Sequence, residues 1–207
     1  MALTSDELRD FFGRCAKARR RFQELAVQAV PRPKLLEHAG RLGLSVEDEM
    51  AQPSEEELAF AFDLAIYTAP PGRSRAIDRV AKQHARLPGE AALVLNGLSR
   101  SWLSVFQVIG PHPEVGFILE DVMLGGEAWV VDEALAENAE PGTVLVTRLA
   151  RIAGFAITCG VVSVLDEAML ARLKQLVRGG EVDPAELVGE PRFAERMWLH
   201  ALGSRVG

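Results

Sequence analysis

The pattern of apolar residues changes sharply between Ser101 and Leu165, and this change most constrains what the chain can fold into. On either side, apolar residues recur at helical spacing. Inside the segment, short apolar runs such as GFILEDVML and PGTVLVTRLA are separated by glycine and proline. Short runs rich in β-branched and aromatic residues are typical of strands. The segment therefore predicts a compact antiparallel β module within a helical protein.

The glycines and prolines of this segment predict where its strands turn. Gly125-Gly126 lies between two apolar runs and predicts a two-residue hairpin turn, because glycine tolerates positive φ angles. Ala153-Gly154 predicts a second tight turn. Residues 110–113 contain two prolines, which lack ladder donors, and are therefore predicted to form a loop. We expect five strands in a meander or, if they twist strongly, in a small partly closed barrel.

The flanking segments predict helices. Thr4 and Glu7 form a capping-box pattern at the start of a helix that reaches about residue 30. Its apolar seam comprises Leu8, Phe11, Cys15, Ala18, Phe22, Leu25 and Ala29. This seam is expected to pack internally, with a homodimer contact as the alternative. Further helices are predicted over residues 34–42, 54–69, 74–85, 89–99, 168–177 and 191–202, with a short helix after Asp183-Pro184.

Together these elements predict an α+β protein. An N-terminal helical bundle (residues 1–100) leads into the β module (101–165), and C-terminal helices (166–207) pack on that module. Trp198, Phe193 and Met197 predict that the last helix contacts the sheet. A chain of 207 residues suits one compact unit, or two that share a core.

Composition narrows the classes of function. Hydrophobic residues make up 48% and charged residues 25% of the chain, as in globular proteins. The net charge of −6 disfavours a general nucleic-acid binder. The longest apolar run, GVVSVL, is far shorter than the roughly 20 residues that span a bilayer. With no secretory leader visible at the start, we expect a cytoplasmic protein, and the residue bias suggests a bacterial chain.

The glycine and core positions of the β segment carry a family resemblance. The positions are Ser104-Val105-Phe106-Gln107-Val108, Gly116, Leu119, Asp121, Gly125-Gly126-Glu127, Val130-Val131, Gly142, Arg148-Leu149, Gly154 and Gly160. At these positions, the middle third of the chain resembles a bacterial β domain that is often found beside SEC-C motifs. The resemblance implies a β module and no defined chemistry. The zinc-binding SEC-C motif itself is absent, because the chain has only two cysteines, far apart.

No complete catalytic or metal pattern occurs in the chain. It contains no nucleophile elbow, phosphate-binding glycine loop or dinucleotide fingerprint. The four histidines and two cysteines lack metal-ligand spacing. We therefore expect no catalytic residue, metal or cofactor, and we interpret Cys15 and Cys159 as buried apolar fillers rather than nucleophiles. An enzyme without a recognisable motif stays open as an alternative, based on Asp121 and Arg148.

Four residues of the β module are candidates for binding a ligand: Trp102, Asp121, Trp129 and Arg148. Glu120 and Asp121 point to opposite faces of their strand, so one of the two is expected to face inward and to be hydrogen-bonded, with Arg148 as its partner if their strands are adjacent. The two tryptophans line a binding groove or, as the alternative, brace the core.

A basic face on the first helix is the last candidate. Arg14, Lys17 and Arg21 share one side of it. They form a solvated surface or, as the alternative, contact nucleic acid or an acidic membrane, although aromatic residues for base stacking are missing there. We expect a non-enzymatic cytoplasmic interaction module with a protein partner. The alternative is a module that binds a small ligand or single-stranded nucleic acid through its β segment.

Overall fold

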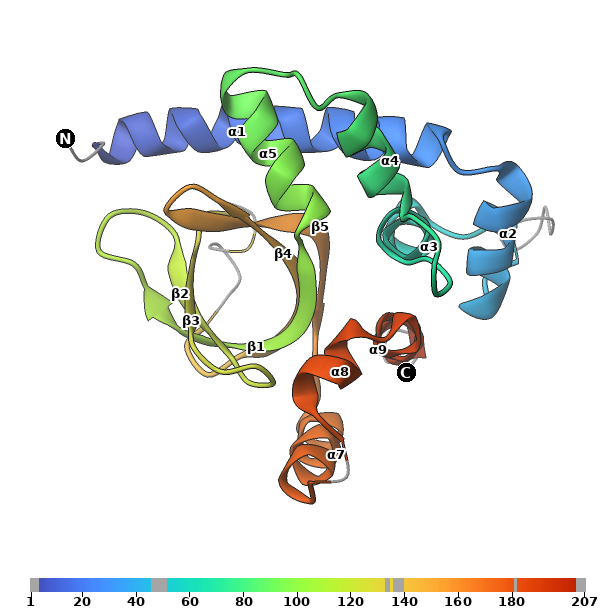
Figure 1. Ribbon diagram of the computed structural model, residues 1–207. Coiled ribbons are helices and arrows are strands. Elements are labelled where there is room, and N and C mark those ends of the chain that lie inside the picture. The colour runs from blue at the N-terminus through green and yellow to red at the C-terminus, as the bar shows by residue number, and fades with distance from the viewer. Residues whose placement is uncertain (1–3, 46–51, 133–134, 136–139, 181, 204–207) are drawn as a thin grey trace. The chain divides into compact units, whose positions relative to one another are not determined.

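The computed structural model describes residues 4–45, 52–132, 135, 140–180 and 182–203, and it divides the chain into two compact units (Figure 1). The barrel unit comprises Met1–Arg19 and Leu87–Gly189. The helical unit comprises Arg20–Arg86 and Glu190–Gly207. Each unit is built from separate stretches of sequence. The units therefore do not coincide with the regions 1–100, 101–165 and 166–207.

Five strands form the centre of the barrel unit. They are β1 (Trp102–Pro111), β2 (Phe117–Asp121), β3 (Glu127–Val130), β4 (Val144–Ile152) and β5 (Phe155–Val164). Their order is β1-β2-β3-β5-β4, and β4 pairs with β1 to close a barrel (Figure 1). All pairs are antiparallel except β3 and β5, which are parallel and meet at Val130 and Ala156.

The predicted five-stranded sheet in an α+β chain is confirmed, but the antiparallel meander is wrong. In a meander β4 would lie beside β3, whereas here β5 takes that place and β4 pairs with β1. β1 is long enough, at ten residues, to pair with β2 along one side and β4 along the other. The barrel is closed rather than partly closed, and closure leaves no unpaired sheet edge.

Apolar side chains fill the barrel interior. The buried residues of this core are Phe106, Val108, Phe117, Leu119, Ala128, Val130, Leu145, Leu149 and Ala156. They follow the two-residue alternation of strands, which sends every second side chain inward. On the outside, α5 (Gly89–Ser99) contacts β4 and α8 (Pro184–Gly189) contacts β1. The unit also contains α7 (Glu167–Arg178), which Asp166 caps by accepting from the Met169 amide at 2.7 Å.

The glycine turns are confirmed, with differences in length. Gly125 and Gly126 have positive φ angles of 76° and 85°, but the β2–β3 loop spans residues 122–126 rather than two residues. Ala153-Gly154 forms the predicted two-residue turn between β4 and β5. The predicted loop over residues 110–113 begins later than expected, because β1 continues to Pro111. A register shift after Val108 absorbs the irregularity, and Pro111 is the last residue of the strand.

Helix α1 (Ser5–Gln28) begins with the predicted capping box. The Glu7 amide donates to Thr4 Oγ1 at 3.3 Å, and the Thr4 amide donates to Glu7 Oε2 at 2.8 Å. The buried seam of the helix is covered within the chain and runs through Leu8, Phe12, Cys15, Phe22 and Ala26. It shares Leu8, Cys15 and Phe22 with the predicted seam. Phe11, Ala18 and Leu25 are only half-buried, and Ala29 is exposed.

Arg19 takes the seam position between Cys15 and Phe22. Its Nη1 donates to the carbonyl oxygen of Thr158 on β5 at 2.5 Å. Because a charged residue at this position interrupts the apolar pattern, the sequence predicted a seam through the residues one position earlier.

The helical unit is organised around α3 (Glu55–Tyr67), with α2 (Arg32–Arg41), α4 (Ala76–Gln83) and α9 (Pro191–Gly203). Ser54 and Glu57 form the predicted capping box of α3. Trp198 of α9 packs on Phe60 of α3 at 5.2 Å between ring centroids, and its Nε1 donates to Asp63 Oδ2 at 3.0 Å. The buried acceptor for this indole therefore lies on α3, within the helical unit itself.

We expect Gly97→Ala to destabilise the barrel unit. A Cβ at Gly97 would lie 2.6 Å from Ile152 Cδ1 and 2.7 Å from the Arg151 carbonyl oxygen, so α5 would have to move away from β4. Overpacking of this kind costs about 1–3 kcal/mol, measurable as a lower urea midpoint. Gly13→Ala is the matched control, because its Cβ meets nothing within 4 Å and the change favours helix by about 1 kcal/mol. Equal effects of the two substitutions would contradict the close contact.

Candidate functional site

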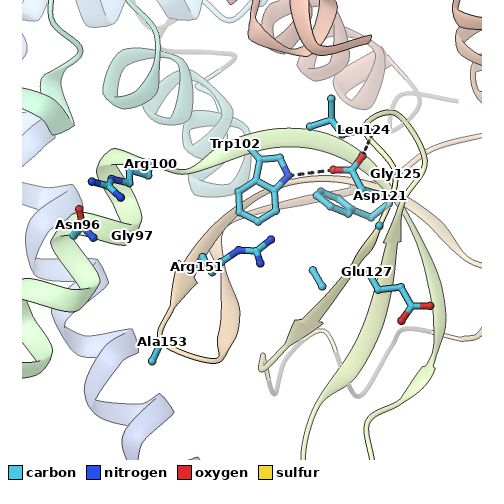
Figure 2. Close-up of a pocket in the computed structure, with 13 residues that line it drawn as sticks. Asn96, Gly97, Arg100, Trp102, Asp121, Leu124, Gly125, Glu127, Arg151 and Ala153 are labelled. Atoms are coloured by element: carbon cyan, nitrogen blue, oxygen red, sulfur yellow. Dashed lines mark hydrogen bonds between the residues drawn. The ribbon is translucent and has the colours of Figure 1, made fainter.

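Two of the four predicted ligand-binding residues come together at one end of the barrel. Trp102 begins β1 and Asp121 ends β2, and Trp102 Nε1 donates to Asp121 Oδ2 at 3.1 Å (Figure 2). Both side chains alternate with outward residues and face the interior side of the sheet. Trp129 and Arg148 point elsewhere, as described below.

The Asp121 carboxylate accepts four hydrogen bonds. Besides the indole, Ser104 Oγ donates to Oδ1 at 2.6 Å. The amides of Met123 and Leu124 also donate to Oδ1, at 3.1 and 2.9 Å. Of the Glu120-Asp121 pair, Asp121 is the buried residue, and its charge is met by dipoles of β1 and of the β2–β3 loop. Asp121 therefore holds Trp102 and the start of this loop in fixed positions.

Arg148 is not the partner of Asp121, and that prediction is wrong. β1 lies between β2 and β4, so the two strands are not adjacent. Arg148 stands opposite Leu103 in the β1–β4 ladder, whereas Asp121 stands opposite Phe106 in the β1–β2 ladder. Phe106 belongs to the barrel core and Leu103 to the alternate, outer side. Arg148 is therefore buried on the outer face, on the opposite side of the barrel wall from Asp121.

Trp129 also lies away from Trp102. It is on β3 beside the inward Ala128 and Val130, so its side chain faces outward. One face of its ring stacks on His112 at 4.0 Å, and Phe155 lies 5.8 Å away. Its Nε1 donates to the Val115 carbonyl oxygen at 2.7 Å. Trp129 therefore braces the β1–β2 loop.

A cavity of about 510 Å³, here called the Trp102 cavity, opens at this end of the barrel (Figure 2). Its lining includes Trp102, Asp121, Leu124, Glu127 and two arginines, Arg100 and Arg151. Arg100 follows the C-terminus of α5, where a cation complements the helix dipole. Arg151 is the next-to-last residue of β4 and extends toward Trp102, with its Cζ 5.4 Å from the centre of that ring (Figure 2).

The two arginines were missed by sequence reasoning. Neither guanidinium forms a hydrogen bond or ion pair with any residue in the described part of the chain, and both are exposed. A usable signal was present for Arg151. In LVTRLAR the residues Leu145, Thr147, Leu149 and Arg151 share one side of the strand, and Leu149 is in the barrel core. The alternation thus selects Arg151, rather than Arg148, for the side that carries Asp121.

The three residues of the predicted basic face of α1 differ in their contacts. Arg14 binds Glu90 through two donors, with distances of 2.9–3.1 Å, and this pairing lowers the pKa of the Glu90 carboxyl. Lys17 and Arg21 are exposed and have no bonded partner among the described residues. Arg14 is therefore engaged within the barrel unit, and Lys17 and Arg21 remain as separate surface charges.

Cys15 and Cys159 are buried, and they are not joined in a disulfide. Burial raises the pKa of Cys15 to about 11, with the charge of Glu90 acting in the same direction. Such a thiol is a poor nucleophile at neutral pH. Among the described residues, no three His, Cys, Asp or Glu side chains are grouped as metal ligands. Over the same residues, no helix has the length and apolar character needed to cross a bilayer.

Comparison with known protein families finds a match over residues 17–179. The chain belongs to DUF7986, a family of unknown function. The matched region includes all five strands of the barrel and the whole Trp102 cavity. Searches of curated proteins and of solved structures find no significant match.

We expect Asp121→Asn to reduce the free energy of unfolding by about 1–3 kcal/mol, because it leaves a buried donor without an acceptor. The new Nδ2 would face the indole N–H, while Oδ1 could still accept its three bonds. Urea unfolding in a Trp102→Phe background is the control. There the indole donor is gone, so the added cost of Asp121→Asn should fall. An unchanged cost would contradict the role assigned to the indole bond.

We expect Cys15 to resist alkylation at pH 8 in the native protein. Its thiol is fully buried and stays protonated well above that pH. Mass spectrometry after brief treatment with iodoacetamide should find Cys15 unmodified, and the same treatment in urea should label it. Rapid labelling of native Cys15 would show that the α1 seam opens.

Proposed function

We propose that the barrel unit is a non-enzymatic binding module, and that the Trp102 cavity takes a small ligand with an anionic group and a planar ring. The observation that carries this proposal is a pair of cavity arginines, Arg100 and Arg151, that bind no carboxylate among the described residues, with Arg151 over the ring of Trp102. An arginine that binds no protein anion keeps its full set of donors for a carboxylate or phosphate.

The two acidic residues that line the cavity, Asp121 and Glu127, do not prevent an anion from binding near the arginines. Asp121 is surrounded by four donors, so much of its charge is already compensated within the protein. Glu127 lies on the other side of the cavity from Asn96 and Arg100 (Figure 2). The arginines therefore dominate the side on which Arg151 approaches Trp102.

The apolar lining supports a planar group in the ligand. Trp102 and Phe106 pack edge to face at 6.3 Å, and both line the cavity. Leu124, 43% exposed, adds apolar surface from the β2–β3 loop. The volume of about 510 Å³ lies within the usual 300–1,000 Å³ of small-molecule sites. An aromatic ring against Trp102, with its anionic group on Arg151, uses both kinds of lining.

The strand order favours a second candidate, single-stranded nucleic acid. A five-stranded barrel in the order β1-β2-β3-β5-β4 has the topology of oligonucleotide- and oligosaccharide-binding barrels, which use the outer face of strands 2 and 3. Topology alone is only an analogy. On that face Trp129 already stacks on His112, and the chain carries a net charge of −6. We therefore rank nucleic acid below a small anion.

The absence of a catalytic role belongs to the proposal as well. Of the groups that line the cavity, Asp121 is held by its four donors and Arg151 is placed to bind rather than react. Two buried cysteines that are not joined in a disulfide suit a reducing compartment, which supports the cytoplasmic location that we propose.

Isothermal titration with AMP, adenosine and ribose 5-phosphate tests the proposal. These probes carry ring and anion, ring alone, and anion alone. We expect AMP to bind most tightly, and Arg151→Gln to weaken AMP binding about tenfold, equivalent to about 1.4 kcal/mol. Arg20→Gln is the matched control, because Arg20 is an exposed arginine that does not line the cavity.

Three results would overturn the proposal. One is the absence of binding by AMP and also by the aromatic acid 4-hydroxybenzoate. Another is an equal loss of affinity in Arg151→Gln and Arg20→Gln. The third is tight, salt-dependent binding of a ten-nucleotide oligothymidine that Arg151→Gln leaves unchanged, which would favour the outer face and the nucleic-acid alternative.

A further inference from the structure

A second cavity lies entirely within the helical unit. It has a volume of about 590 Å³ and is formed by α2, the segment that follows α3, and the start of α9. Its lining includes Lys34, His38, Arg41, Thr68, Glu190 and Arg192. We call it the His38 cavity. None of its residues lines the Trp102 cavity, so the two can be tested separately.

Two of the lining groups have unused hydrogen-bonding capacity. His38 is half-buried, yet neither ring nitrogen bonds to any residue that the structure describes. Arg192 is exposed, and within the described part of the chain its guanidinium has no hydrogen bond or ion pair. A half-buried imidazole usually finds a partner, so these groups have donors to offer a ligand.

Two further cations are held in place by Glu37. Lys34 Nζ lies 2.5 Å from Glu37 Oε2, and Arg41 Nη2 lies 2.6 Å from Glu37 Oε1. The hydrogen bond from Lys34 is the main reason why the pKa of Glu37 is lowered. Arg41 also reaches Glu195 of α9 at 3.6 Å. One carboxylate thus positions two cations on the same side of the cavity.

The remaining wall offers few donors. Pro70, Pro71 and Pro191 have no N–H, and the Thr68 hydroxyl already donates to the Leu64 carbonyl oxygen at 2.6 Å. A ligand in this cavity must therefore be recognised by the charged side chains. Lys34, Arg41 and Arg192 outnumber the acidic lining residues, Glu37 and Glu190, by one charge. Protonation of His38 would add a second.

We propose that the His38 cavity binds a small anion with phosphate or carboxylate groups, held by Arg192 and His38 between the cations that Glu37 positions. The site is independent of the ligand proposed for the barrel. It needs no covalent step, and it would make the helical unit a second sensor of small anions in the same chain.

Binding at this cavity is coupled to a proton. Burial, and next the charge of Arg41, lower the pKa of His38 in the free protein, with Lys34 acting in the same direction. Glu37 and Glu195 oppose this effect. Since the imidazole is neutral at pH 7 and an anion favours its charged form, binding takes up a proton. The affinity for the anion therefore rises as the pH falls toward 6.

Titration calorimetry with pyrophosphate and with citrate, using the full chain, tests this proposal. Two buffers of different ionisation enthalpy at pH 7 report proton uptake. We expect binding of at least one probe, proton uptake on binding, and a tenfold or greater loss of affinity in Arg192→Gln. His38→Gln should bind without proton uptake. Arg196→Gln is the matched control, because it removes an exposed arginine of α9 that does not line the cavity.

The outcomes distinguish the His38 cavity from the Trp102 cavity, and a phosphate ligand from a carboxylate ligand. Tighter binding of pyrophosphate indicates a phosphate ligand, and tighter binding of citrate a carboxylate ligand. Arg151→Gln should leave both affinities unchanged, whatever becomes of the barrel proposal. The proposal fails if neither probe binds, if Arg192→Gln and Arg196→Gln weaken binding equally, or if His38→Gln still takes up a proton.

Discussion

The buried carboxylate of Asp121 organises the end of the barrel that carries the Trp102 cavity. Removing a carboxylate from water is costly unless donors replace the water, and here four donors converge on it. Two come from β1 and two from the β2–β3 loop, so one side chain fixes the β1–β2 register and the path of the loop. The position of Trp102, and with it the Trp102 cavity, follows from these bonds.

The same pairing of an indole with a buried carboxylate recurs in the helical unit. Trp198 donates to Asp63 there, as Trp102 donates to Asp121 in the barrel. The bond of Trp198 joins two helices that lie far apart in the sequence, and the bond of Trp102 joins two neighbouring strands. Each bond gives the indole N–H an acceptor inside the protein. In both units a polar contact thus selects one packing among the many that apolar residues alone would allow.

Local features were predictable from the sequence, and long-range partners were not. The capping boxes at Thr4 and Ser54 and the glycine turns depend on residues close in sequence. The partner of Asp121 depends on which strands are adjacent. Because β1 rather than β4 lies beside β2, Ser104 took the role expected of Arg148. Likewise, the division into two units joins α9 to α3 across 123 residues of intervening chain.

The most direct test of the central claim is the indole N–H spectrum of ¹⁵N-labelled protein during titration with AMP. The three tryptophans give three indole signals, and Trp102→Phe identifies one of them. The account predicts that the Trp102 signal shifts in a saturable way, while the signals of Trp129 and Trp198 stay in place. A Trp102 signal that does not move while Trp129 shifts would contradict it, and would place the ligand on the outer face of the barrel.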